Sequence, residues 1–444
     1  MLRMSLKRLA GMIGGEATDN GVEVVGMSHD SRRIEPGNLF CALPGERVDG
    51  HEFVARAATA GAAAALVTRE VEVDLPQLVV DDVLLAMGRI ASSWREQMPA
   101  TVIGVTGSNG KTTVKEMLAA MLSRMGPTLA TQGNYNNEIG VPLTLTRLSP
   151  AHQFAVIEMG ASRPGDIAYL CEIARPEIAI LTNAAAAHLE GFGSLDGVAR
   201  TKGELFESLA PSGLAVINAD DAYSGLWHEL AGHCRSITFG TGEQAVVRGH
   251  MVAGRIEVQT PAGEFEYLPS LPGRHNMMNA LAATAVAVTL EQPLSEIAAA
   301  LGAMPGVPGR LQVHRHPDGW TLIDDTYNAN PASLYAGLQV LTEQGGERWL
   351  VLGDMAELGE DSAKLHAEMG QAAADMGVAR LFGVGELCRN SVHAFGRGAS
   401  HYDSHEALAS ALSAELHSGV NCLVKGSRSM HMERIVQSLV GEVA

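Results

Sequence analysis

The sequence has no closely spaced pair of cysteines. Its five cysteines are scattered, at Cys41, Cys171, Cys234, Cys388 and Cys422. A disulfide framework needs an even and regularly spaced set, and a zinc site needs paired ligands, so neither organises this chain. Dispersed thiols are typical of proteins kept in a reducing compartment, which predicts a cytosolic protein.

Positive charge and long apolar runs are also scarce. The 444 residues include 32 Lys and Arg against 50 Asp and Glu, a formal net charge of -18. Nucleic acids and anionic membranes would be repelled by most of such a surface, so neither is an expected partner. No apolar run is long enough to span a bilayer, and glycines interrupt the apolar part of residues 1–15, unlike a signal peptide. We therefore expect a soluble cytoplasmic protein.

Three blocks of the chain differ in their pattern, as the length predicts for about three domains. Residues 1–82 mix short strand-like runs with turn signals. Residues 83–307 begin with a helical stretch and then alternate apolar runs with helical segments, which predicts a parallel sheet covered on both faces. Within them, residues 246–268 change to a period of two, which predicts an antiparallel appendage. Residues 308–444 repeat the strand–helix alternation, which predicts a Rossmann-like second sheet.

The strongest chemical signal is a glycine-rich turn between an expected strand and an expected helix. Its central residues are Gly107, Ser108, Asn109, Gly110, Lys111, Thr112 and Thr113. Glycines let backbone N–H groups point at phosphate oxygens, and the helix that follows presents its positive end to the same anion. Lys111 can reach the outer phosphates of ATP, and the Thr112 hydroxyl can join a Mg²⁺ shell. The alternative is a glycine-rich turn with an incidental lysine, because five residues rather than four separate Gly104 from Gly110.

Polar residues follow the next two expected strands of the second block. Glu158 comes directly after the apolar run 154–157, and His188 lies shortly after the run 178–181. Because ligands bind beyond the carboxyl ends of parallel strands, both side chains should lie on the same sheet edge as Lys111. A carboxylate and an imidazole beside a triphosphate predict a second divalent ion. The alternatives are a helix-capping carboxylate and a surface histidine.

These residues, with others downstream, resemble the Mur ligase family, and the likeness extends over all three blocks. The segments that carry it are 104–113, 131–142, 158–160, 188–194, 201–204, 272–276, 308–310, 324–331, 353–359 and 425–429. The resemblance implies three α/β domains: residues 1–82 for a UDP-sugar, 83–307 with a central parallel sheet for ATP, and 308–444 for the incoming amine. It also implies a monomer.

The resemblance further implies a reaction. ATP, with two Mg²⁺ ions, would phosphorylate the terminal carboxylate of UDP-MurNAc-tripeptide, and the amine of D-Ala-D-Ala would attack the acyl phosphate. Phosphorylation gives the acid a better leaving group than oxide, and cations offset the repulsion between the two anions. Lys111, Glu158, His188 and Lys202 are the expected catalytic residues. By the same likeness, Lys202 carries a carbamate that helps to hold the second metal, with Thr112, Glu158 and His188.

Other roles are implied residue by residue. The resemblance implies that Asn276 contacts the adenine ring. It also implies that Arg310 and Asp325, from the third block, contact the nucleotide. Asn328 and Asn330 are expected on the side of ATP and the amine, although a polar turn after a strand is the alternative. The residues expected to contact the UDP-sugar or its peptide are Ser31, Arg32, Gly45, Arg47, Thr131, Asn134 and Asn137.

Two further readings stay open. A sister ligase that adds the third amino acid would share the fold and the phosphate loop, but the Asp-Asn-Pro-Arg motif of its diaminopimelate version is absent from this sequence. A nucleotide-gated ATPase switch would need neither a UDP-binding first block nor a third α/β domain. Phosphate release that requires both a carboxylate and an amine would distinguish a ligase from a switch.

Overall fold

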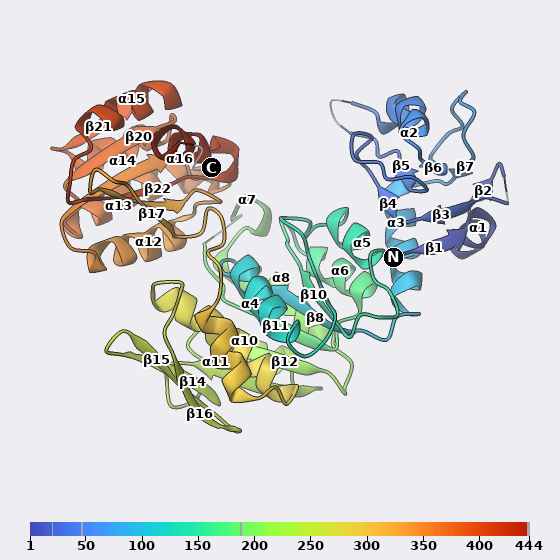
Figure 1. The fold of residues 1–444 in the computed structure, drawn as a ribbon, viewed down its shortest axis with the longest axis horizontal. Helices are drawn as coiled ribbons and strands as arrows, with labels where there is room; N and C mark the ends of the chain where they lie inside the picture. The colour runs from blue at the N-terminus through green and yellow to red at the C-terminus, as the bar shows by residue number, and fades with distance from the viewer. Residues whose placement is uncertain (20, 46–47, 187–188, 442–444) are drawn as a thin grey trace.

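The computed structural model describes residues 1–19, 21–45, 48–186 and 189–441, which form three α/β domains (Figure 1). The amino-terminal and carboxy-terminal domains stand on opposite sides of a central domain, which contains the largest sheet. The fold class expected from the sequence, three α/β domains with a parallel sheet in the middle one, is confirmed.

The amino-terminal domain is built on a five-stranded sheet of order β2-β7-β6-β5-β4. Its strands are β2 (Glu16–Ala17), β4 (Met27–Ser28), β5 (Leu39–Cys41), β6 (Ala64–Val67) and β7 (Gln77–Val79). Helix α2 (Val54–Thr59) packs on one face of this sheet. The other elements are the antiparallel strands β1 (Arg3–Ser5) and β3 (Glu23–Val25) and the helix α1 (Leu6–Ile13).

Helix α3 (Val83–Arg95) joins the first domain to the central one. Asp82 caps it, accepting a hydrogen bond of 3.0 Å from the N–H of Leu85. The buried side chain of Met87 belongs to the same apolar cluster as Leu9 of the first domain and Ile167 of the central domain. Because the two domains share this core, α3 fixes the first domain against the central one through burial of apolar surface.

The central domain contains a nine-stranded sheet of order β16-β15-β14-β13-β12-β11-β8-β10-β9. Its strands are β8 (Thr101–Thr106), β9 (Thr128–Ala130), β10 (Phe154–Glu158), β11 (Ile178–Leu181), β12 (Leu214–Asn218), β13 (Arg235–Gly240), β14 (Val247–Val252), β15 (Arg255–Thr260) and β16 (Gly263–Tyr267). The last three strands are antiparallel as expected, but they are not a separate appendage. Strand β14 pairs in parallel with β13, at Phe239 and Val247, and so extends the main sheet.

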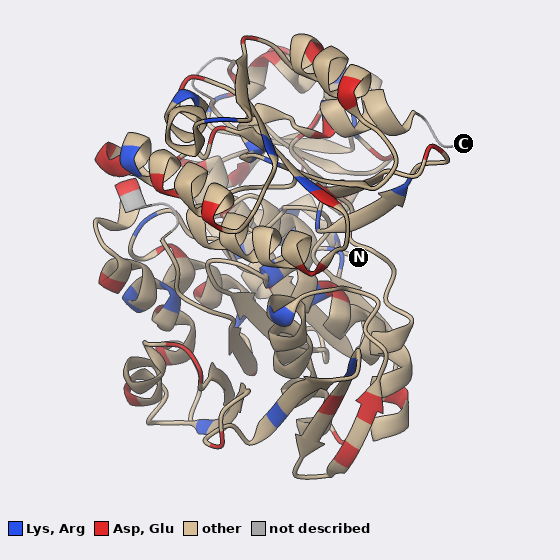
Figure 2. Cartoon of the chain, turned by 90° about the vertical axis from the view of Figure 1, so that its left-hand side faces the viewer, with Lys and Arg blue, Asp and Glu red and all other residues tan. Residues whose placement is uncertain are grey.

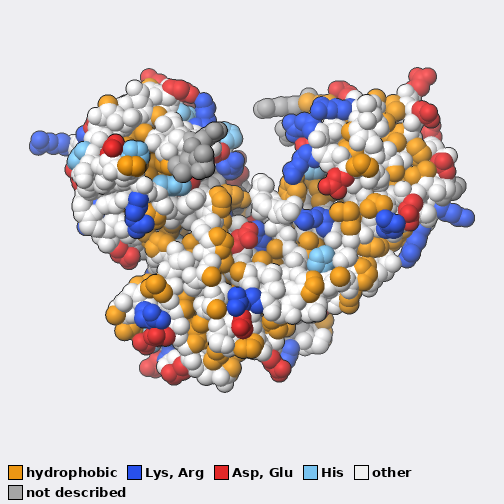
Figure 3. All heavy atoms as spheres, viewed as in Figure 1, with side chains coloured by type: hydrophobic (Ala, Val, Ile, Leu, Met, Phe, Trp, Pro, Cys, Tyr) orange, Lys and Arg blue, Asp and Glu red, His pale blue; other side chains and the backbone are white. Residues whose placement is uncertain are grey.

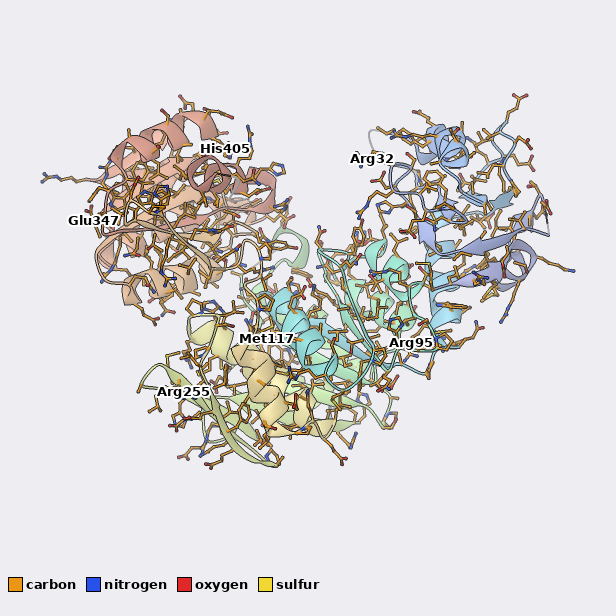
Figure 4. All side chains as sticks on the ribbon, in the orientation of Figure 1. Arg32, Arg95, Met117, Arg255, Glu347 and His405 are labelled. Carbon is orange, nitrogen blue, oxygen red and sulfur yellow. The ribbon has the colours of Figure 1, made fainter. Side chains whose placement is uncertain are left out.

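Helices cover both faces of the central sheet. On one face lie α4 (Lys111–Leu122), α10 (Arg274–Thr289) and α11 (Leu294–Gly302). Met117, labelled in Figure 4, is one of the α4 residues buried there at helical spacing. The other face is covered by α5 (Gly140–Leu145), α6 (Asp166–Ala174), α8 (Leu195–Glu207) and α9 (Ser224–Leu230).

The carboxy-terminal domain has a six-stranded sheet of order β17-β18-β22-β19-β20-β21, parallel except for β17. Its strands are β17 (Gln312–Arg315), β18 (Thr321–Asp325), β19 (Glu347–Gly353), β20 (Arg380–Val384), β21 (Ala399–Tyr402) and β22 (Val420–Lys425). One face is covered by α12 (Pro331–Glu343), α13 (Ser362–Asp375) and α14 (Cys388–Phe395). The other is covered by α15 (His405–Glu415) and α16 (Glu433–Val440).

The helices and the distribution of charged residues can be compared with what the composition predicts about membranes and nucleic acids. Among the helices of the described residues, none combines the length and the apolarity that crossing a membrane would need. Figure 2 shows acidic and basic residues interspersed over the helices and strands of the visible face, without a broad basic band. This face is unlike the basic surfaces that bind nucleic-acid phosphates.

Candidate active site

The glycine-rich loop lies between β8 and α4 and contains two glycines that no other residue could replace without movement. Gly107 has a φ of 146°, and a Cβ there would lie 1.8 Å from the Thr182 hydroxyl oxygen. Gly110 has a φ of 84°, and a Cβ there would lie 2.3 Å from Asn279 Oδ1. Both positions therefore combine a left-handed backbone with a close approach that only glycine allows.

Hydrogen bonds hold this loop against the end of the neighbouring strand β11. The N–H of Ser108 donates to the Asn183 carbonyl oxygen at 2.9 Å, and the N–H of Asn109 donates to Asn183 Oδ1 at 3.0 Å. The Thr182 hydroxyl donates to the Asn109 carbonyl oxygen at 2.6 Å. The loop is thus held in place by the protein itself, and the first N–H groups of α4, which have no intrahelical acceptor, can bind an anion.

Lys111 begins α4 and folds back over the loop. Its ammonium donates to the carbonyl oxygens of Gly107 at 2.6 Å and Ser108 at 3.3 Å. Burial lowers the pKa of Lys111, the Glu158 carboxylate opposes this shift, and the Arg310 cation adds to it. Phosphate oxygens could replace these two carbonyl contacts and would restore a full negative partner to the ammonium.

Glu158 ends β10 and is buried, with 1% of its surface exposed. Its Oε1 accepts a hydrogen bond from Asn136 Nδ2 at 2.8 Å, and its backbone N–H donates to the Thr131 hydroxyl at 3.0 Å. Its Oε2 is also buried and has no hydrogen-bond partner among the described residues. A buried carboxylate oxygen without a partner is costly, and a divalent cation would satisfy it. The residues present therefore fit a metal at this position.

Lys202 lies on α8 and is also buried, with 1% of its surface exposed. Its ammonium lies 5.6 Å from the centroid of the Phe192 ring. Burial holds the pKa of Lys202 well below its usual range, and the Lys111 cation adds to the shift. This environment favours the neutral amine. His188, the other metal ligand expected with Glu158, lies outside the described residues.

The carboxy-terminal domain contacts the phosphate loop directly. Arg310 donates to the Thr112 hydroxyl at 3.2 Å, and its guanidinium carbon lies 4.1 Å from the centroid of the Tyr327 ring. Asn330, which caps α12, donates through Nδ2 to Asn109 Oδ1 at 2.9 Å. The Thr112 hydroxyl, expected to bind Mg²⁺, here accepts a hydrogen bond from arginine instead.

Asp325 and Asn328 are held within the carboxy-terminal domain. The Asp325 carboxylate forms a buried ion pair with the Lys425 ammonium, which also donates to the Asn328 carbonyl oxygen at 3.0 Å. The Asn328 side chain accepts from the N–H of Arg428 at 3.4 Å. These contacts fix the carboxyl ends of β18 and β22 relative to one another.

A cavity of about 980 Å³ lies between the central and the carboxy-terminal domains. Many residues singled out in the sequence line it: Ser108, Asn109, Gly110, Lys111, Thr113, Asn134, Asn137, Glu158, Asn276, Arg310, Asp325, Asn328 and Asn330. Gly107, Thr112, Thr131 and Lys202 are not among the described lining residues. The Thr131 hydroxyl is buried and engaged with Glu158, so it supports the wall of the cavity from behind.

Further polar residues from α10 and its surroundings line the cavity. Asn276 donates through Nδ2 to the Pro272 carbonyl oxygen at 2.8 Å and accepts from Asn279 Nδ2 at 3.3 Å. Asp220 and Arg274, whose carboxylate and guanidinium lie 3.6 Å apart, also line the cavity. Sequence reasoning missed Asn279, Asp220 and Arg274. The spacing of Asn276 and Asn279, three residues apart on one helix face, was the signal available for Asn279.

The first-domain residues lie apart from this cavity. Ser31 is buried, whereas the Arg32 side chain is exposed and pairs with Asp30 at 2.9 Å, which holds the Asp30 pKa at about 2. Figure 4 shows Arg32 on the side that faces the carboxy-terminal domain, across the hollow visible in Figure 3. Gly45 donates its N–H to the Val48 carbonyl oxygen at 3.1 Å, and Arg47 lies outside the described residues.

A second group of metal-ligand types occurs in the carboxy-terminal domain, but its atoms are engaged. Candidate ligand atoms of Asp354, His366 and Cys388 lie within 4.8 Å of one another. His366 Nε2 accepts from the N–H of Met355 at 2.9 Å, and its Nδ1 lies 2.7 Å from the Ser362 carbonyl oxygen. Asp354 accepts from the N–H of Cys388 at 2.8 Å. This group has a structural role.

Three segments of the chain match known family descriptions. Residues 105–287 match the Mur ligase middle domain, and residues 309–428 match the Mur ligase, glutamate ligase domain. Residues 23–121 match the description "Mur ligase family, catalytic domain". The chain is also 43% identical, over 447 residues and 99% of both chains, to the UDP-N-acetylmuramoyl-tripeptide–D-alanyl-D-alanine ligase of Escherichia coli (strain K12).

Solved structures give the same result for the fold. A crystal structure of MurF from Acinetobacter baumannii superimposes with a TM-score of 0.91 at 34% identity, covering 100% of both chains. The MurF ligase of Thermotoga maritima in complex with ADP has a TM-score of 0.83 at 29% identity, covering 94% of this chain and 98% of that one. The similarity therefore includes all three domains.

Proposed function

The chain belongs to the Mur ligase family, and from this premise we propose that it is an ATP-dependent ligase that adds D-alanyl-D-alanine to UDP-MurNAc-tripeptide. The product is the UDP-MurNAc-pentapeptide of peptidoglycan synthesis, with ADP and phosphate released. The observation that carries the proposal is the cavity where the phosphate loop, the buried carboxylate of Glu158 and the carboxy-terminal domain meet.

The chemistry requires two anions to meet, the tripeptide carboxylate and the γ-phosphate of ATP. The first N–H groups of α4 bind the phosphates, and Lys111 moves from its carbonyl contacts to the outer phosphate oxygens. Bound Mg²⁺ would neutralise phosphate charge and polarise the phosphoryl group. Transfer of the phosphoryl group to the carboxylate oxygen gives an acyl phosphate. The amine of D-Ala-D-Ala then attacks the acyl carbon, and phosphate leaves.

The metal ligands are part of the same proposal. Glu158 and Thr112 would hold Mg²⁺, and His188 would join them. Arg310 would exchange its hydrogen bond with Thr112 for a nucleotide phosphate, which frees the hydroxyl for the ion. Support for this arrangement comes from the buried Oε2 of Glu158 and from the closeness of Arg310 to the loop.

Carbamylation of Lys202 is a further part of the proposal. A neutral lysine amine adds to carbon dioxide, loses a proton and becomes an anionic carbamate with two oxygen donors. The lowered pKa of Lys202 supports the first step, because the amine must be unprotonated. The carbamate would then serve as an oxygen ligand for the second ion and would neutralise the charge of Lys111 nearby.

The remaining assignments follow the domains. Residues 1–82 bind the UDP-sugar through Ser31, Arg32, Gly45 and Arg47, and Asn134 and Asn137 lie on the path of its peptide, which Thr131 supports. Residues 83–307 bind ATP, with Asn276 at the adenine and Asp325 and Arg310 contributed by residues 308–444. Asn328 and Asn330 lie on the amine side. Such an enzyme works as a monomer in the cytoplasm, where its nucleotide substrates are found.

The experiment that tests this function measures phosphate release and product mass together. Enzyme, ATP and Mg²⁺ are incubated with UDP-MurNAc-tripeptide, with D-Ala-D-Ala, or with both. We expect rapid phosphate release, and a mass gain of D-Ala-D-Ala less water, only in the mixture that holds both substrates. ATP hydrolysis at the same rate without D-Ala-D-Ala would favour the nucleotide-gated switch. A product formed from a single amino acid and UDP-MurNAc-dipeptide would favour the sister ligase.

A further inference from the structure

The loop of residues 131–139 connects two regions that the proposed reaction uses separately. Tyr135 contacts the first domain: its hydroxyl accepts a hydrogen bond from Arg33 Nη1 at 3.1 Å, and its ring meets His29 edge to face at a centroid distance of 6.2 Å. The next residue, Asn136, donates through Nδ2 to Glu158 Oε1 at 2.8 Å. Adjacent residues thus hold the first domain on one side and the buried carboxylate on the other.

The backbone of this loop leaves little room for either residue to move alone. The N–H of Gly160 donates to the Asn136 carbonyl oxygen at 2.7 Å, and a Cβ at Gly160 would lie 2.9 Å from Asn136 Oδ1. A Cβ at Gly140 would lie 2.4 Å from Tyr135 Cα, so the loop closes tightly on the start of α5. Helix α5 is itself buried in the core. A shift of Tyr135 is therefore transmitted to Asn136.

We infer that Tyr135 and Asn136 are positioning residues that couple the UDP-sugar domain to the metal-binding carboxylate. Asn136 donates to Oε1 of Glu158, a residue that lines the cavity, and so fixes the position of Oε2, as outer partners orient metal ligands elsewhere. Tyr135 makes this orientation depend on the position of Arg33 and His29, which flank Ser31 and Arg32, the residues proposed to bind the UDP-sugar. Binding of the sugar nucleotide tightens metal binding at Glu158, and by linkage metal tightens sugar-nucleotide binding by the same factor. The inference rests on the proposed function, because it takes Glu158 as a metal ligand.

The test is a titration with Mn²⁺, followed by electron paramagnetic resonance, of the full-length enzyme saturated with a non-hydrolysable ATP analogue. It is run with and without UDP-MurNAc-tripeptide. In the wild type we expect the sugar nucleotide to tighten the weaker Mn²⁺ site. Asn136→Ala should weaken that site by about tenfold to a hundredfold under both conditions. Tyr135→Phe, which keeps the ring, should have wild-type Mn²⁺ affinity in the absence of UDP-MurNAc-tripeptide. In its presence, the increase in Mn²⁺ affinity should be about two- to tenfold smaller than in the wild type, which is the contribution of one hydrogen bond.

Matched variants separate the possible outcomes. Arg33→Ala removes the donor on the other side and should behave as Tyr135→Phe does, whereas Gln132→Ala, on the exposed part of the same loop, should leave both affinities unchanged. The tripeptide carboxylate can itself bind the metal and so raise Mn²⁺ affinity directly. This direct effect persists in Tyr135→Phe, so the decrease in tightening that this variant shows measures the coupling through Tyr135. Undiminished Mn²⁺ affinity in Asn136→Ala, or undiminished tightening in Tyr135→Phe, overturns the inference. If Glu158→Gln still binds Mn²⁺ at the weaker of the two sites with wild-type affinity, the proposed metal site at Glu158 is wrong.

Discussion

Replacing Gly110 by alanine is the most direct perturbation of the phosphate loop. An alanine there must adopt a φ of 84°, a left-handed conformation that costs about 1–2 kcal/mol for a residue with a side chain. Its Cβ would also lie 2.3 Å from Asn279 Oδ1, so the loop or the buried Asn279 side chain must shift by about 1 Å to reach an ordinary contact distance. The first N–H groups of α4, which we propose bind phosphate, move with any shift of the loop. We expect nucleotide affinity to fall at least about tenfold, which corresponds to about 1.4 kcal/mol.

Gly133→Ala is the matched control, because Gly133 has a φ of 53° and an added Cβ there would meet nothing within 4 Å. Both variants share the backbone strain, but only Gly110→Ala has the collision. Isothermal titration calorimetry with a non-hydrolysable ATP analogue should show near-normal affinity for Gly133→Ala. Adding Asn279→Ala to Gly110→Ala should recover part of the lost affinity. Wild-type affinity in Gly110→Ala, with the fold intact by circular dichroism, would refute the reasoning.

Three further predictions concern charged side chains. Lys111→Ala should lower kcat by about a hundredfold to a thousandfold, because it removes a preorganised cation, while Lys364→Ala on the surface should have no effect in the same phosphate-release assay. Lys202→Met should raise the melting temperature in buffer free of carbon dioxide. Because the Lys202 pKa is lower in the folded protein than in the unfolded chain, protonation favours unfolding, so the gain should be absent above about pH 10.5 and grow as the pH falls toward 7. Asp325→Asn leaves the buried Lys425 ammonium without its partner and should cost about 3–5 kcal/mol in urea unfolding. Asp403→Asn, in the exposed pair with Arg389, should cost under about 1 kcal/mol.

Local patterns predicted the strands and the phosphate loop well. The apolar runs 154–157 and 178–181 both became central strands, because burial on both faces of a parallel sheet selects continuous apolar segments. The same logic placed Glu158 at a strand end beside the loop. The short edge strand β9, by contrast, has three residues and no pattern of its own, and it forms by pairing with β10.

Contacts between distant segments were the part that the sequence did not reveal. Asn136 stands in a polar stretch beside Asn134 and Asn137, and nothing local distinguishes the residue that reaches Glu158 from its neighbours. Lys425 belongs to a segment that carried the family likeness, but its pairing with Asp325 crosses 100 residues. The extension of the central sheet by β14 likewise depends on tertiary pairing, which period-two alternation does not specify.

The central step of the proposed reaction is the transfer of the γ-phosphoryl group to the tripeptide carboxylate beside Lys111 and Glu158. UDP-MurNAc-tripeptide labelled with ¹⁸O in its terminal carboxylate tests it directly, with ATP, Mg²⁺ and D-Ala-D-Ala. If the carboxylate attacks phosphorus and the amine then displaces phosphate, mass spectrometry will find one labelled oxygen in each phosphate released. Phosphate that carries oxygen from solvent alone, while the pentapeptide still forms, would contradict an acyl-phosphate intermediate.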